Sequence, residues 1–181
     1  AQEIEGLCED ALSGYQELEN LGLTGSDTSM ELAALLAMVT IYSTINGKPD
    51  LDKARDLSER SLNLARQVND YSSQASILWQ SMLIENLAGE DFFKALEFGN
   101  QSLQMARQHD LEEQIAYTLQ DMGRAYLAVG QFVEGKEAFE GARESWRALG
   151  NQPMLADNLI NSAGVAFAEG ADAGGNEMIE E

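Results

Sequence analysis

The sequence repeats itself at intervals of about 40 residues. When residues 53–67 are placed on 94–108, the Lys-Ala, Ser-Leu and Ala-Arg-Gln segments of the two stretches coincide. Three glycines, Gly89, Gly130 and Gly170, follow the same spacing. A period of this size is typical of stacked supersecondary units, each too small to bury its own apolar side. The repeat therefore predicts a row of similar units.

Each unit is predicted to contain two helices, because apolar residues recur three and four positions apart and no segment alternates polar and apolar residues over a strand's length. First helices are expected at 29–46, 72–88, 112–129 and 153–169, and second helices at 2–21, 51–68, 91–108 and 132–148. The predicted fold class is all-α, an α-solenoid of antiparallel helix pairs. The expected organisation is one solenoid over 1–170 (half repeat 1–21; repeats at about 29–70, 71–111 and 112–151; partial repeat 152–170), with an acidic, glycine-rich tail at 171–181.

Helix-start chemistry accompanies these boundaries. Thr28 followed by Glu31 has the spacing of a capping box, and Asp110 followed by Glu113 repeats it. Asp50 stands where an N-cap acceptor is needed before a helix. These residues are therefore predicted to cap three helices.

Small residues at repeat positions are expected to let neighbouring helices approach closely, and large ones to fill the remaining core. The small set is Ala34, Ala75, Ala116, Ala156, Thr40, Ser81, Gly123 and Ala163. The large set is Leu62, Leu64, Phe92, Leu103, Phe132, Phe139 and Trp146.

Residues 116–132 resemble the first half of a tetratricopeptide repeat, with Gly123, Tyr126 and Gly130 at the family's small, aromatic and turn positions. The period departs from the family's usual value of about 34. Repeats of the longer length resemble those of bacterial multidomain transcriptional activators and cyclase-linked regulators. The resemblance implies a right-handed superhelix whose first helices line a concave groove.

On that geometry, a partner-binding groove is predicted. Its residues would be Tyr42, Trp79, Leu83, Tyr117, Gln120, Arg124 and Asp157. Aromatic and arginine side chains are typical of binding hot spots. Tyr42 and Trp79 have an alternative role in packing between helices. Arg124 would either receive a carboxylate from a peptide or pair with Asp121 or a neighbouring glutamate.

The chain carries 31 acidic and 11 basic residues, a net charge of −20, and all its basic residues lie within 48–147. This charge argues against a nucleic-acid-binding surface. The acidic ends favour solubility, or else attraction to a basic partner. No apolar run is long enough to span a membrane, and the single cysteine, Cys8, favours a reducing, cytoplasmic location.

Few residues point to catalysis. His109 is the one histidine, so no histidine-based metal cluster can form, and it is expected to lie at a helix end. The acidic residues Glu134, Glu137, Glu140 and Glu144 follow helical spacing, as on a solvated helix face. The sequence therefore predicts no catalytic residues, no metal site and no cofactor.

The expected function is a non-catalytic protein- or peptide-binding scaffold, part of a larger bacterial regulatory or signalling protein, with transcription regulation among its settings. One alternative is a sensor domain that binds a small molecule or peptide in the groove, and another is a carboxylate-based enzyme. Weak dimerisation is also expected through exposed solenoid ends, with Ile4 and Leu7 at one end and Leu159 and Phe167 at the other.

Overall fold

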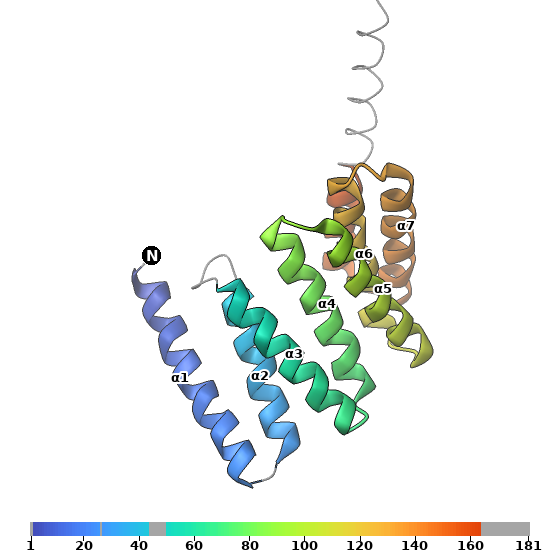
Figure 1. Ribbon diagram of the computed structural model, residues 1–181. Helices are drawn as coiled ribbons and strands as arrows, with labels where there is room; N and C mark the ends of the chain where they lie inside the picture. Colours follow the sequence, from blue (N-terminus) through green and yellow to red (C-terminus); the bar gives the residue numbers. More distant parts are fainter. Residues whose placement is uncertain (1, 26, 44–49, 164–181) are drawn as a thin grey trace, which may run out of the picture. The chain divides into compact units, whose positions relative to one another are not determined.

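The computed structural model describes residues 2–25, 27–43 and 50–163, and within them it contains helices and turns without a strand. The prediction of an all-α fold is therefore confirmed. The helices are α1 (Gln2–Gly25), α2 (Thr28–Ser43), α3 (Leu51–Gln67), α4 (Tyr71–Ala88), α5 (Phe92–Gln108), α6 (Glu112–Ala128) and α7 (Phe132–Ala148), followed by helical residues 152–163 (Figure 1). Phe167, Ile4, Leu7 and the tail at 171–181 lie outside the residues whose side chains are described.

The chain divides into two compact units, unit 1 (Ala1–Asp91) and unit 2 (Phe92–Glu181). In unit 1, α2 packs against α1, α3 and α4, and α3 also packs against α4. In unit 2, α6 packs against both α5 and α7. Consecutive helices are thus neighbours within each unit, as short turns require.

The turns between helices repeat with the period of the sequence. A residue with positive φ follows five of the described helices: Asn69 (55°), Gly89 (68°), Asp110 (53°), Gly130 (74°) and Gly150 (68°). Left-handed backbone at this position bonds the last carbonyl groups of a helix and stops its propagation. Glycine adopts it without the steric penalty of a side chain, which explains why Gly89 and Gly130 occupy equivalent positions of successive repeats.

The capping predictions are confirmed at one site and wrong at two. The Asp50 carboxylate accepts a hydrogen bond from the Lys53 backbone N–H at 3.1 Å, as predicted. At α2 the cap is Asp27, which bonds the Met30 N–H at 3.1 Å, and Thr28 is already the first helical residue. The two residues are adjacent and both suit an N-cap, so spacing alone did not separate them.

The second error concerns Asp110. This residue belongs to the turn after α5, where its φ is 53°. Leu111 is the N-cap of α6 and makes no side-chain capping bond. Asp110 ends the preceding helix and does not begin the next one.

Asp70 is the N-cap of α4. Its carboxylate accepts hydrogen bonds from the Ser73 hydroxyl at 2.7 Å and the Ser73 N–H at 3.0 Å, and these bonds lower the pKa of Asp70 from its ordinary 3.8. A lowered folded-state pKa stabilises the fold above pH 3.8, and this contribution is lost as pH falls through the folded-state value. We expect Asp70→Ala to reduce the free energy of unfolding by about 1 kcal/mol near neutral pH, and by less in acid.

Urea titrations followed by circular dichroism near neutral pH and in strong acid measure this difference. Asp56→Ala, at an exposed site on α3, is the control and should have little effect. A cost of Asp70→Ala that is equal at both pH values would contradict the assigned role of the carboxylate charge.

The core of unit 1 gathers apolar side chains from all four helices. The main cluster consists of Leu12, Leu35, Met38, Val39, Tyr42, Ala54, Leu57 and Ile84. A second cluster of Leu32, Ala65 and Ile77 joins α2, α3 and α4. Burial of these side chains holds the four helices together.

In unit 2, α6 and α7 meet around Trp146. This indole is fully buried with Ala116 and Ala142, and Met154 and Leu155 of the following helix pack against the same group. The predicted core residues Leu103, Phe139 and Trp146 are buried. Phe92 and Phe132 are only partly buried, as are Leu62 and Leu64 in unit 1.

Gly123 allows α6 to approach α7 closely. A Cβ atom added there would lie 2.8–2.9 Å from three atoms of the Phe139 ring, which is fully buried. We expect Gly123→Ala to lower the free energy of unfolding by about 1–3 kcal/mol, although alanine is the better helix former. Gly14→Ala is the matched control on α1, because its Cβ would meet nothing within 4 Å. Equal midpoints for the two variants in urea denaturation would contradict the close approach.

The prediction of buried small residues is wrong at three positions. Ala34, Ala75 and Ala116 are fully buried, but Ala156, Ala163 and Thr40 are exposed. Residues 156 and 163 are the repeat equivalents of Ala116 and Gly123, which lie against α7. No described helix covers that face of residues 152–163, so its small residues remain accessible.

Candidate functional site

Three of the predicted groove residues, Gln120, Arg124 and Asp157, form one polar network in unit 2, between α6 and residues 152–163. Arg124 donates through Nη1 to Asp121 and through Nη2 to Asp157 Oδ2 at 3.1 Å. Gln120 Nε2 donates to the same Asp157 oxygen at 2.7 Å. Asn161 Nδ2 also reaches that oxygen at 2.9 Å. Asp157 therefore accepts from three side chains, which fixes its orientation.

The network continues into the core through Gln120. Its Oε1 accepts a hydrogen bond from the Trp146 indole at 2.9 Å, and the residue is only 3% exposed. Tyr117 packs edge-on against Trp146, with ring centroids 4.8 Å apart and an interplanar angle of 80°. Two of the predicted residues, Tyr117 and Gln120, thus contact one buried tryptophan, which the sequence marked only as core filling.

The network presents a charged rim to solvent. The side chains of Arg124 and Asp157 are 46% and 48% exposed, whereas that of Asp121 is 8% exposed. Of the two roles considered for Arg124, the structure shows pairing with Asp121, and it adds Asp157. One guanidinium between two carboxylates leaves the cluster with a net negative charge. This rim together with Tyr117 is hereafter called the Arg124 cluster.

The three predicted residues of unit 1 lie on α2 and α4. Tyr42 is 9% exposed and belongs to the core, with the Lys53 ammonium 5.2 Å from its ring centroid. Trp79 and Leu83 on α4 are partly exposed. For Tyr42 the structure therefore shows the packing role that was the alternative to groove exposure.

A partly buried ion pair in unit 1 was not predicted. Arg55 on α3 donates to both carboxylate oxygens of Glu85 on α4, at 3.0 and 3.2 Å, and also to Asp52 at 3.0 Å. The bonds to Glu85, whose side chain is 4% exposed, raise the pKa of Arg55 above its ordinary value. The period could not reveal this pair, because neither residue recurs at the equivalent position of the next unit.

A cavity of about 520 Å³ lies beside Tyr42 in unit 1. Its walls are Glu9, Leu12, Ser13, Gln16, Tyr42, Asp50 and Lys53. The lining mixes apolar side chains with both signs of charge, and Lys53 already pairs with Asp50 at 3.6 Å. Its size is within the range of small-ligand sites.

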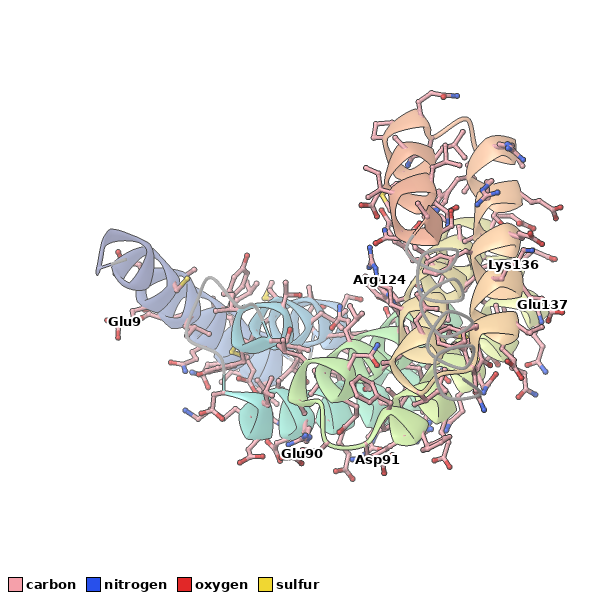
Figure 2. All side chains as sticks on the ribbon, turned by 90° about the horizontal axis from the view of Figure 1, so that it is seen from above. Glu9, Glu90, Asp91, Arg124, Lys136 and Glu137 are labelled. Atoms are coloured by element: carbon pink, nitrogen blue, oxygen red, sulfur yellow. The ribbon has the colours of Figure 1, made fainter. Side chains whose placement is uncertain are left out.

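Features associated with catalysis are scarce in the described part of the chain. No group of three histidine, cysteine or carboxylate side chains there could hold a metal ion. The acidic row Glu134, Glu137, Glu140 and Glu144 is exposed, and Figure 2 labels Glu137 beside Lys136 on α7. None of the described helices is both long and apolar enough to cross a bilayer.

No protein-family model matches the chain, and no curated protein sequence matches it. Among solved structures, the chain is similar to the crystal structure of BtubC (BKLC) from P. vanneervenii, with a TM-score of 0.77 and 16% sequence identity. The match covers 90% of this chain and 66% of that one, so the chain spans just under two thirds of that protein's length. At this identity the similarity shows an all-helical fold and nothing further.

Proposed function

We propose that the chain is a tetratricopeptide-like α-solenoid segment that binds a protein or peptide and catalyses no reaction. Three features support the solenoid: paired helices of nearly equal length, turns that recur about every 40 residues, and the tetratricopeptide-like stretch at 116–132. In repeats of this kind, each helix pair leaves apolar surface that the next pair covers.

The Arg124 cluster is the observation that carries the binding role. Its polar groups are held by one another and by Trp146, so a partner would meet side chains that are already ordered. Preordered contact residues reduce the entropic cost of association. The exposed Arg124 and Asp157 offer a donor and an acceptor to a partner.

Selection from a phage-displayed library of linear peptides tests this function. We expect selected peptides to bind the wild-type chain in isothermal titration, and Arg124→Ala to weaken them by about five-fold or more. Lys136→Ala, on the exposed side of α7, is the control and should bind as the wild type does. Circular dichroism of each variant separates lost binding from lost folding.

Two outcomes would count against the proposal. A library that yields no peptide above background contradicts the binding function itself. Peptides that bind the wild type and Arg124→Ala equally would remove the Arg124 cluster from the interface.

The cavity beside Tyr42 favours a second candidate, a sensor that binds a small molecule. A ligand that binds only the folded state raises the unfolding temperature, and the increase grows with the logarithm of the ligand concentration divided by its Kd. Screening a metabolite library by thermal shift should then give hits whose effect disappears when Ser13→Trp fills the cavity. Hits that shift both proteins equally, or no hits, would contradict this role.

A further inference from the structure

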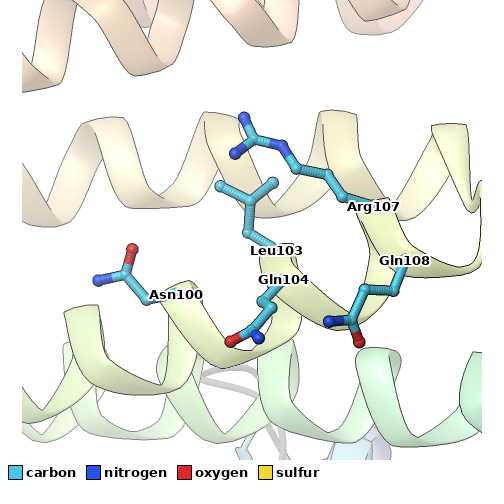
Figure 3. Close-up of a pocket in the computed structure, with 5 residues that line it drawn as sticks. All are labelled: Asn100, Leu103, Gln104, Arg107 and Gln108. Atoms are coloured by element: carbon cyan, nitrogen blue, oxygen red, sulfur yellow. The ribbon is translucent and has the colours of Figure 1, made fainter.

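A second hollow, of about 470 Å³, runs along the surface of α5 in unit 2. Its lining residues are Asn100, Leu103, Gln104, Arg107 and Gln108, all from this one helix (Figure 3). Leu103 is 8% exposed and forms an apolar floor, while the other four side chains are exposed. This hollow is hereafter called the α5 groove.

The polar side chains of the α5 groove are not engaged with the rest of the described chain. Asn100, Gln104, Arg107 and Gln108 make no side-chain hydrogen bond or ion pair within the described residues. Amide and guanidinium groups of this kind are free to bind a ligand without breaking an existing contact. In this respect the α5 groove differs from the Arg124 cluster, whose polar groups bind one another.

The three amides are spaced to match an extended peptide. Asn100, Gln104 and Gln108 are four positions apart, so they lie about 6 Å from one another along the helix axis. Every second residue of an extended chain is separated by about 6.6–6.8 Å. Each primary amide has both a donor and an acceptor and can therefore bond one peptide unit of such a chain.

The charge of the α5 groove favours an acidic ligand. Arg107 is its one charged lining residue, and residues 98–109 contain no carboxylate although the whole chain has a net charge of −20. A guanidinium binds a carboxylate in a bidentate geometry that a neutral side chain cannot reproduce. Glu97, ten residues before Arg107, would repel an acidic residue placed at the other end of the groove.

We propose that the α5 groove binds an extended peptide segment, with the Asn100, Gln104 and Gln108 amides on its backbone and Arg107 on an acidic side chain. The proposal rests on the peptide-binding function proposed above and assigns it a second surface and a partner chemistry. The apolar floor at Leu103 accommodates a neighbouring aliphatic side chain of the peptide.

Fluorescence anisotropy with three labelled peptides tests the proposal on the full chain. The first probe is a repeat of Ser-Leu-Glu-Thr, and in the other two probes glutamine or lysine replaces each glutamate. Each peptide is about twelve residues long, which is enough to span the groove in an extended conformation. We expect the glutamate peptide to bind about five-fold or more tightly than the glutamine peptide. Arg107→Gln should abolish that preference, and Gln104→Ala should weaken both peptides.

Arg147→Gln is the matched control. Arg147 is the counterpart of Arg107 in the next repeat, and it is also exposed. Arg147 lies in the last turn of α7 and Arg107 in the last turn of α5, so each cation interacts in the same way with the dipole of its helix. Arg147→Gln should keep the preference for glutamate. Alternate N-methylation of the glutamate peptide should weaken its binding, because N-methyl groups remove backbone donors.

Two results with the glutamate and glutamine peptides would overturn the proposal. In the first, Arg107→Gln still prefers the glutamate peptide; in the second, Arg147→Gln loses this preference as fully as Arg107→Gln does. Tight binding of the lysine peptide also overturns it, because the groove would then select the opposite charge. Any of these results leaves the proposed function intact if the binding of library-selected peptides is still weakened by Arg124→Ala. Absence of binding by every probe and every library peptide would instead contradict the proposed function.

Discussion

Trp146→Ala is expected to lower the free energy of unfolding by about 3–5 kcal/mol. The indole is fully buried, meets the Tyr117 ring, and donates a hydrogen bond to Gln120. Alanine leaves a cavity between α6 and α7 and an unpaired amide oxygen on Gln120, which is itself buried. The loss should also disorder the Arg124 cluster, because Gln120 connects that cluster to the core.

Urea denaturation followed by circular dichroism measures the loss, with Val133→Ala as the control on the same helix. Val133 is 64% exposed, so its truncation should change the free energy of unfolding by less than about 0.5 kcal/mol. Trp146→Phe keeps most of the buried area but removes the indole donor, and should fall between the two. A midpoint for Trp146→Ala equal to that of Val133→Ala would refute the role assigned to the indole.

Ala95→Asp is expected to have the other large effect, a loss of at least about 4 kcal/mol that leaves unit 2 substantially unfolded. Ala95 is fully buried on α5, so a carboxylate there would be removed from water. In a helical repeat, each helix covers the apolar side of its neighbours. Unfolding of α5 would therefore expose those apolar sides, and the loss of structure should extend beyond α5.

Gln101→Asp provides the comparison, because Gln101 is exposed on the same helix and the substitution introduces the same charge. It should leave the thermal transition nearly unchanged. A melt of Ala95→Asp that coincides with that of Gln101→Asp would rule out the burial of this face of α5.

Most helix limits followed closely from sequence because the period and the turn residues agree with one another. An exception is α1, which ends at Gly25 and not at residue 21 as predicted. The predicted helix at 132–148 coincides with α7, and α4 and α5 each differ from prediction by one residue. The left-handed turn residues Gly89 and Gly130 already stand out in the sequence, because they follow the spacing of the repeat.

Burial at individual positions was less predictable, because equivalent residues of a repeat do not have equivalent neighbours. Ala116 is buried by α7, whereas Ala156, its counterpart, has no described helix against it. Gln120 occupies the position of Trp79. It is buried, with its amide oxygen bonded by the Trp146 indole and its amide nitrogen bonded to Asp157. Such a polar pair involves single positions of the repeat and therefore leaves no periodic signal.

The candidate sites were likewise predicted from sequence only in part. Tyr117, Gln120, Arg124 and Asp157 were expected to line a groove from the family resemblance. The structure joins Gln120, Arg124 and Asp157 by hydrogen bonds, but Gln120 is buried, and Tyr117 packs against Trp146. Asn161 was missed because it lies in the partial repeat, where the alignment is least constrained. The α5 groove was missed because its amides have no distinctive sequence motif.

Hydrogen–deuterium exchange on Ala95→Asp, read by mass spectrometry, is the most direct test of whether this is a stack of interdependent helix pairs. If each helix covers the apolar side of the next, amides of α5, α6 and α7 should lose protection together, although Ala95 belongs to α5 alone. Protection lost from α5 while α6 and α7 exchange at wild-type rates would contradict the account.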